Sequence, residues 1–173
     1  MTDNRSFGSR FGTRFGIGGD PIVAFQWLAG VTVATTFVLM LLGAYTKAIG
    51  AGLSCPDWPT CYGTWIPFLR PEVYADAPYT QWQIFAEWAH RGLAMVTGFL
   101  ILGTAVAGWR LKSLSRIARV SAVFALAVLP IQVVLGGLTV TELLDPVIVT
   151  SHLGAAILIF GALVVTTVAA RDA

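Results

Sequence analysis

Residues 21–46 read PIVAFQWLAGVTVATTFVLMLLGAYT, and this uncharged apolar run decides the fold class of the chain. A helix of about 20 apolar residues crosses the hydrocarbon core of a bilayer, so the run is long enough to span a membrane. It also exceeds the apolar core of about 7 to 15 residues that secretory signal peptides carry. The run therefore predicts a retained membrane anchor and not a cleaved leader.

Three further stretches have the same character, and they predict membrane spans at about 82–109, 117–141 and 146–170. Backbone polar groups in hydrocarbon need partners within the segment, so all the spans are predicted to be helices. Most connections between them are short, which favours antiparallel neighbours. The Gly136–Gly137 pair predicts close helix approach in the third span. Residues 21–173 are thus predicted to form one all-α domain, an integral membrane four-helix up-down bundle.

The composition agrees with a membrane protein and argues against other classes. The chain has 173 residues, of which 56% are hydrophobic and only 12% charged. A soluble domain of this size needs more charge to cover its surface. The formal net charge of +2 is too small to indicate a nucleic-acid partner. We therefore expect the lipid bilayer as the surroundings and no nucleic acid.

Lysine and arginine residues predict how the bundle is oriented. Arg5, Arg10 and Arg14 precede the first span, and four more basic residues, Arg110, Lys112, Arg116 and Arg119, lie at the junction of the second and third spans. Cytoplasmic segments carry such an excess of positive charge. The chain is therefore predicted to be N-in/C-in, a multi-pass protein of the cytoplasmic membrane, with residues 47–81 as an extracytoplasmic loop.

The first 20 residues are predicted to be a disordered cytoplasmic tail. They repeat the motif RFG among glycine and serine, a composition that cannot bury a core. The alternative is a weak contact of the tail with anionic lipid headgroups.

The chain contains only two histidines, and the predicted topology brings them to one depth. His90 and His152 lie near the starts of the second and fourth spans, which run in the same direction. At 1.5 Å per residue, each falls about 9 to 13 Å along its helix. Two imidazoles at one depth in a four-helix bundle can ligate a haem iron from opposite faces. The alternative is that each is a polar interfacial residue or makes a helix–helix hydrogen bond.

Two charged residues flank the first histidine. Glu87 precedes His90 by three positions, so both lie on one helix face. The carboxylate could orient the imidazole or accept a proton from a bound substrate. Arg91 could pair with a haem propionate. The alternative is that Glu87 and Arg91 form an ordinary surface ion pair at the water boundary.

The predicted outer loop holds both cysteines of the chain. Cys55 and Cys61 lie in LSCPDWPTCYG, on the side where disulfides form. The pair is either a structural disulfide or a redox-active pair, and its spacing is not that of a CxxC motif. Trp58, between the cysteines, suits an interfacial aromatic belt.

Four motifs together resemble the haem A synthase family. They are TKAIGAGLSCPDWPTCYG at 46–63, EWAHR at 87–91, GGLTV at 136–140 and DPVIVTSHLGAA at 145–156. They occur in the order and topology that the family uses, and the resemblance extends from about residue 21 to the end of the chain.

The resemblance implies an oxidoreductase that converts the C8 methyl of haem O into the formyl group of haem A, for terminal oxidase biogenesis. It implies that His90 and His152 are axial ligands of haem iron. Glu87 matches a glutamate important for activity, and Cys55 and Cys61 match the outer-loop pair of the family. Haem B is the implied cofactor and haem O the implied substrate.

This chain departs from the pattern because familiar members have two four-helix repeats, each with its own histidine pair. A single repeat predicts a homodimer that restores two sites. Haem O synthase and terminal oxidase assembly proteins are further expected partners. Two other functions stay open on the sequence. One is a non-catalytic bis-histidine b-type protein for electron transfer or haem carriage, and the other is a membrane thiol oxidoreductase using the cysteines.

Overall fold

The structure, a computed structural model, describes residues 20–171 and consists mainly of four α-helices. They are α1 (Pro21–Ala48), α2 (Gln81–Arg110), α3 (Arg116–Thr141) and α4 (Pro146–Ala169). Two short 3-10 helices, η1 (Pro67–Leu69) and η2 (Pro71–Tyr74), lie between α1 and α2. The predicted disordered tail, with Arg5, Arg10 and Arg14, lies outside the described residues except for Asp20.

Capping side chains explain where the helices begin. The carboxylates of Asp20 and Asp145 each accept a hydrogen bond from the backbone N–H two residues later. Each of these residues is followed by a proline at the first helical position. This proline suits the first turn, where its missing N–H leaves no bond unmade. Thr80 opens α2 with a capping box. The helices therefore start at positions that the local sequence specifies.

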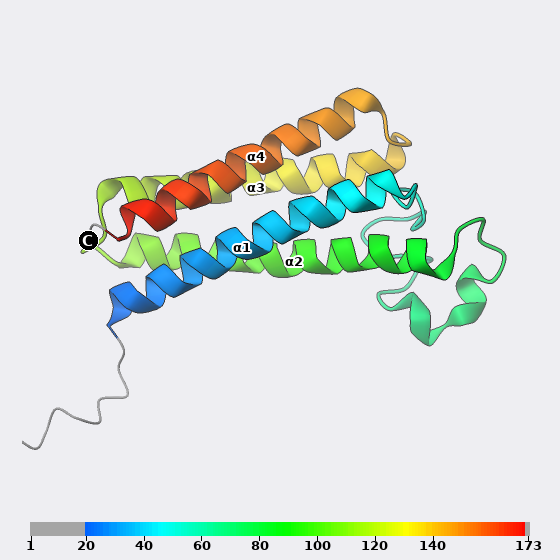
Figure 1. Ribbon diagram of the computed structural model, residues 1–173, viewed down its shortest axis with the longest axis horizontal. Coiled ribbons are helices and arrows are strands. Elements are labelled where there is room, and N and C mark those ends of the chain that lie inside the picture. The colour runs from blue at the N-terminus through cyan, green and yellow to red at the C-terminus, as the bar shows by residue number, and fades with distance from the viewer. Residues whose placement is uncertain (1–19, 172–173) are drawn as a thin grey trace, which may run out of the picture.

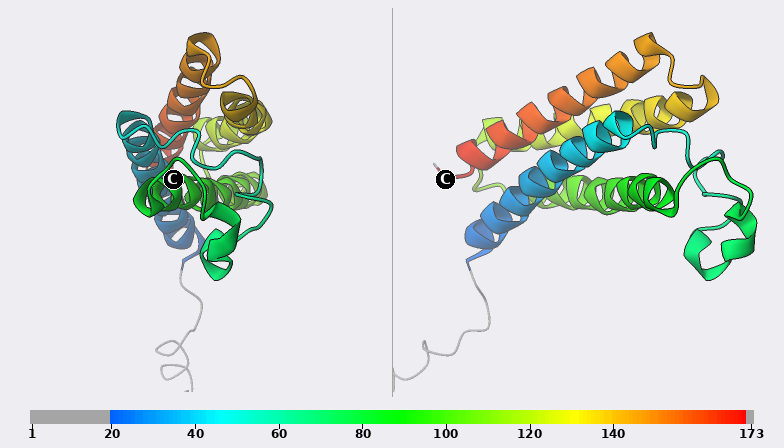
Figure 2. Two further views of the ribbon diagram at one scale, coloured as in Figure 1. Left: turned by 90° about the vertical axis from the view of Figure 1, so that its right-hand side faces the viewer. Right: turned by 45° about the vertical axis from the view of Figure 1, so that its right-hand side comes forward.

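The helices form an up-down bundle in which each one packs against two neighbours. Contacts join α1 with α2, α2 with α3, α3 with α4, and α4 with α1. The end-on view shows α1 opposite α3 and α2 opposite α4, at the corners of a square (Figure 2). The segment between α1 and α2 lies at one end of the bundle, and the described chain ends lie at the other (Figure 1). The predicted all-α four-helix bundle is confirmed.

The outside of the bundle is apolar along its length. All four helices are long and apolar enough to cross a membrane. Large apolar side chains such as Trp27, Phe99 and Val168 are exposed on it. Exposed apolar surface of this extent needs a lipid environment. The chain is thus a multi-pass membrane protein, as predicted.

Hydroxyl groups join the helices inside each hairpin. Thr32 of α1 and Thr104 of α2 form a 2.9 Å hydrogen bond, and Ser121 of α3 forms one of 2.9 Å with Thr166 of α4. Thr104 and Thr166 each follow the histidine of their helix by fourteen residues. The two hairpins therefore place a histidine toward one end and an interhelical hydroxyl pair toward the other.

Candidate haem-binding site

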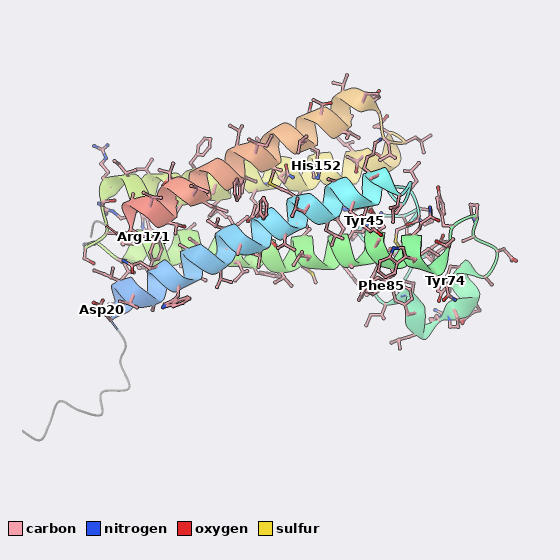
Figure 3. The ribbon with its side chains drawn as sticks, in the orientation of Figure 1. Asp20, Tyr45, Tyr74, Phe85, His152 and Arg171 are labelled. Atoms are coloured by element: carbon pink, nitrogen blue, oxygen red, sulfur yellow. A yellow bond between two sulfur atoms is a disulfide. The ribbon has the colours of Figure 1, made fainter. Side chains whose placement is uncertain are left out.

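The two histidines lie on helices that are diagonal in the bundle. His90 belongs to α2 and His152 to α4, and no Cα atoms of these two helices lie within 8 Å of one another. Figure 3 shows His152 in the half of the bundle nearer the α1–α2 connection. The two histidines therefore stand on opposite helices of the bundle, each in the N-terminal half of its helix.

Each imidazole lies against a glycine of the preceding helix. A Cβ atom on Gly43 of α1 would stand 2.8 Å from Cε1 of His90. A Cβ atom on Gly136 of α3 would stand 3.2 Å from Cε1 of His152. Any side chain at Gly43 would therefore displace the ring, and one at Gly136 would crowd it. These contacts show that Gly136 accommodates a histidine ring, a role that the prediction of close helix approach did not include.

Several polar atoms of this region are buried without a hydrogen-bond partner among residues 20–171. They include Nδ1 of His90, Nδ1 of His152 and Oε1 of Gln132. Nε2 of His152 lies 3.4 Å from the amide nitrogen of Gln132. Buried polar atoms in proteins almost always have partners, so these unpaired imidazole nitrogens make the region a candidate ligand-binding site.

The donor set fits a haem. Nowhere in residues 20–171 do three or more His, Cys, Asp or Glu side chains gather as ligands for a metal ion. A haem brings four nitrogens of its own and needs only two axial ligands from the protein. Two imidazoles on opposite helices are a donor set of that kind. The pair His90 and His152 would hold such a group.

Glu87 is a buried carboxylate one helical turn before His90. Its exposed fraction is 6%, and its Oε1 accepts a 3.0 Å hydrogen bond from Nε of Arg91. The ion pair is enclosed, since the side chains of Glu87 and Arg91 are 8% and 13% exposed. A buried carboxylate without a partner would be costly, so Arg91 compensates the charge that Glu87 carries.

Arg91 also contacts the outer loop. Its Nη1 donates to the carbonyl oxygens of Asp57 and Thr60 at 2.5 and 2.6 Å, and its Nη2 donates to that of Cys55 at 2.8 Å. With the bond to Glu87, four of its five N–H groups are used. The remaining N–H of Nη2 is the one that could serve the predicted haem propionate.

The loop that receives Arg91 is a disulfide ring. Cys55 and Cys61 are bonded to one another and fully buried. Asp57 accepts hydrogen bonds from the hydroxyl of Thr60 and from the backbone N–H groups of Tyr62 and Gly63. Burial raises the pKa of the Asp57 carboxyl, but these hydrogen bonds outweigh that effect and hold the pKa below its ordinary value. Asp57 therefore stabilises the ring as an anion.

Trp58 connects this ring to the second hairpin. A Cβ atom on Gly137 of α3 would stand 3.3 to 3.4 Å from the indole ring of Trp58. The side chain is 47% exposed, so its other side faces outward. It was predicted to belong to an interfacial belt, and the structure shows in addition that it packs on α3 beside the residue that accommodates His152. Sequence reasoning missed this contact, together with Gly43 and Gln132.

The profile of the COX15-CtaA family, described as cytochrome oxidase assembly proteins, matches residues 26–173. A protein of Halobacterium salinarum named protoheme IX farnesyltransferase is 32% identical over 87% of this chain and 30% of its own length. A Shewanella oneidensis protein named heme A synthase is 34% identical over 73% of this chain and 40% of its own length. One of that name from Bacillus pumilus is 27% identical over 75% of this chain and 40% of its own length.

The chain spans less than half the length of these curated relatives. No solved structure matches it. The family profile, however, covers most of the chain, including both histidines, Glu87 and the disulfide ring. The chain therefore belongs to the COX15-CtaA family of cytochrome oxidase assembly proteins.

Proposed function

We propose that the chain acts in haem A biosynthesis as an oxidoreductase, oxidising the C8 methyl of haem O to the formyl group of haem A. The observation that supports this most directly is a juxtaposition. Two imidazoles with unpaired buried nitrogens occupy opposite helices, and a buried carboxylate lies one turn from one of them. Two of the relatives are named heme A synthase, which is the activity proposed here.

His90 and His152 would hold the iron of the haem in this proposal. When bound, the iron supplies the redox chemistry that the apolar side chains of the bundle cannot provide. The glycines behind the rings, Gly43 and Gly136, leave room for both imidazoles between the helices. Haem B as a resident cofactor belongs to the same proposal.

Glu87 would handle protons near the reacting methyl group. Oxidation of a methyl to a formyl group adds an oxygen atom from water or dioxygen and removes protons and electrons. The electrons pass through the haem iron to an external electron acceptor, and the protons need a nearby acceptor on the protein. The carboxylate is buried, and Arg91 keeps it paired and oriented. A carboxylate in this position can take up a proton or stabilise developing positive charge on the substrate.

A second candidate function is farnesyl transfer to haem, because three of the relatives have the name protoheme IX farnesyltransferase. The matched segment makes up only 27 to 30% of those longer chains. Most of each such chain thus lies outside the part that resembles this protein. The buried Glu87 near a histidine pair favours haem oxidation over prenyl transfer.

The test is the identity of the haems that the protein produces. The purified protein in nanodiscs is supplied in one reaction with haem O and a quinone-class electron acceptor in aerated buffer. In another reaction it is supplied with haem B and farnesyl diphosphate. We expect haem A from the first reaction and no haem O from the second. The Glu87→Gln variant should keep its bound haem and yield at least about tenfold less haem A, since loss of a general base costs that or more.

Other outcomes would change the assignment. Haem O formed in the second reaction would support farnesyl transfer. Bound haem B without conversion of haem O, and equal behaviour of the Glu87→Gln variant, would support an electron-transfer or haem-carrier protein. Disulfide exchange with partner thiols in the absence of haem would support a thiol oxidoreductase.

A further inference from the structure

The guanidinium of Arg91 binds the backbone of the disulfide ring. Three of its hydrogen bonds end on backbone carbonyl oxygens of residues 55, 57 and 60, more than thirty positions away in sequence. All three belong to the ring that Cys55 and Cys61 close. Arginine presents five donors in one rigid plane, so a single side chain can satisfy several carbonyls that point inward.

The countercharge of Arg91 is Glu87 and not the carboxylate of the ring. Asp57 directs its carboxylate to Thr60, Tyr62 and Gly63, while only its backbone oxygen faces Arg91. Glu87 instead accepts from Nε of the guanidinium. The terminal nitrogens of Arg91, Nη1 and Nη2, therefore bind the loop. Its Nε binds the carboxylate of Glu87, which lies one helical turn before His90.

The disulfide ring also contacts the hairpin formed by α3 and α4. The indole of Trp58 packs on Gly137 of α3, and the neighbouring Gly136 accommodates His152. Outside the ring, Gly52 lies against Leu144 in the turn between α3 and α4, where a Cβ atom would approach its side chain to 3.2 Å. The ring thus extends from Arg91 on α2 to Gly137 on α3, at the end of the bundle where the α1–α2 connection lies (Figure 1).

We propose that Arg91 is a positioning residue that fixes the Glu87 carboxylate and holds the Cys55–Cys61 ring in place as a cover over the outer end of the haem site. The inference rests on the proposed function for the role of Glu87, while the cover itself rests on the contacts of Arg91 and Trp58. A lysine would retain the charge but presents its donors from a single nitrogen, so it cannot reach Glu87 and three carbonyls at once.

The experiment compares Arg91→Lys and Arg91→Gln with a matched control, Arg70→Gln. Arg70 also pairs with a glutamate, Glu72, in the outer segment, but both side chains are more than 60% exposed. The first readout is the rate at which a membrane-impermeant phosphine reduces the disulfide in haem-free protein. Loss of hydrogen bonds from a buried charged group should raise that rate about tenfold or more in both Arg91 variants, and Arg70→Gln should not change it.

The second readout is made on haem-loaded protein. Both Arg91 variants should retain the six-coordinate bis-histidine spectrum, while kcat for haem A formation falls about tenfold or more and KM for haem O stays within about twofold. A merely structural defect would instead lower bound haem and alter the spectrum. Trp58→Ala, which leaves the Glu87–Arg91 pair intact, should speed disulfide reduction and affect kcat less than Arg91→Gln.

Two results would overturn the inference. One is an Arg91→Lys protein with wild-type disulfide reduction and wild-type haem A yield. The other is loss of bound haem from both Arg91 variants at an unchanged reduction rate, which would assign the arginine to the haem itself. If the wild-type protein makes no haem A but the Arg91 variants still expose the disulfide, the proposed function fails and the cover remains.

Discussion

At the scale of single residues, the candidate site is built from two histidine–glycine pairs. The sequence was sufficient to single out His90 and His152, because they are the only histidines and fall at similar heights on parallel spans. It was not sufficient to identify Gly43 or Gln132. Their importance depends on which helix face meets the imidazole, and this is fixed by packing between helices and not by local pattern.

Replacing either histidine should abolish bis-histidine ligation. His90→Ala and His152→Ala each leave one axial position empty or open to water, because no other histidine exists in the chain to replace them. The optical and EPR spectra should change from low-spin six-coordinate to high-spin. Ser151→Ala, at an exposed position next to His152, serves as the control. An unchanged spectrum in one histidine variant would remove that residue from the site.

Gly43→Ala should disturb the haem site without removing a ligand. The new Cβ would stand 2.8 Å from Cε1 of His90 and displace the ring. Overpacking of this kind costs about 1 to 3 kcal/mol, and the displaced imidazole should change the EPR g values of the bound haem. Gly30→Ala on the same helix meets nothing within 4 Å and should leave the spectrum unchanged. Identical spectra for both variants would contradict the assigned role of Gly43.

At the scale of elements, the four helices and the outer loop were predictable, and the inside of the loop was not. The helices can be predicted from the sequence alone, because each is a long apolar stretch with few charged residues. The sequence left the cysteines open between a structural bond and a redox pair. It also left Arg91 without a known partner in the loop, because its carbonyl acceptors lie 31 to 36 positions away. Such contacts depend on how the loop folds back over α2.

The disulfide ring should lose stability in acid. The pKa of Asp57 is lowered in the folded ring, so its contribution is complete above the ordinary carboxyl pKa of about 4 and is lost as pH falls through the lower folded value. Limited proteolysis of the outer loop by pepsin, measured between about pH 5 and pH 2, should accelerate as pH falls.

The control for that measurement is Asp57→Asn. The amide retains one acceptor oxygen but carries no charge to lose, so its loop should be cleaved faster at about pH 5 and show a flatter pH dependence. Equal pH profiles for wild type and Asp57→Asn would show that another group governs the acid sensitivity of the loop.

At the scale of the whole molecule, the up-down bundle places the outer loop and the α2–α3 connection at opposite ends (Figure 1). The charge distribution predicts that the loop faces the extracytoplasmic side. After reduction, an impermeant maleimide added to intact cells should label Cys55 and Cys61. A cysteine introduced at Lys112 in a variant lacking both native cysteines should react only after the membrane is opened. The reverse labelling pattern would show that the protein has the opposite orientation in the membrane.

The chain should also self-associate. The described residues hold one histidine pair, whereas the proposed reaction, with a haem B cofactor and a haem O substrate, would need two sites. A second copy would supply the other pair, and a two-fold axis is the commonest way to join identical chains. Nanodiscs sorted by mass into one-copy and two-copy populations should make haem A only with two copies. Full activity from single copies would show that one unit suffices.

The diagonal placement of His90 and His152 has a thermodynamic consequence. Within the described chain, the two histidines belong to different hairpins, which a short segment between α2 and α3 connects. A haem iron bound by both histidines would hold the two hairpins together in the folded state. Haem binding would therefore be thermodynamically linked to unfolding of the bundle. At a haem concentration of 100 times the dissociation constant, this linkage adds about 2.7 kcal/mol to the unfolding free energy. The melting temperature of the bundle should therefore report haem occupancy, and a haem held by one histidine alone should raise it less.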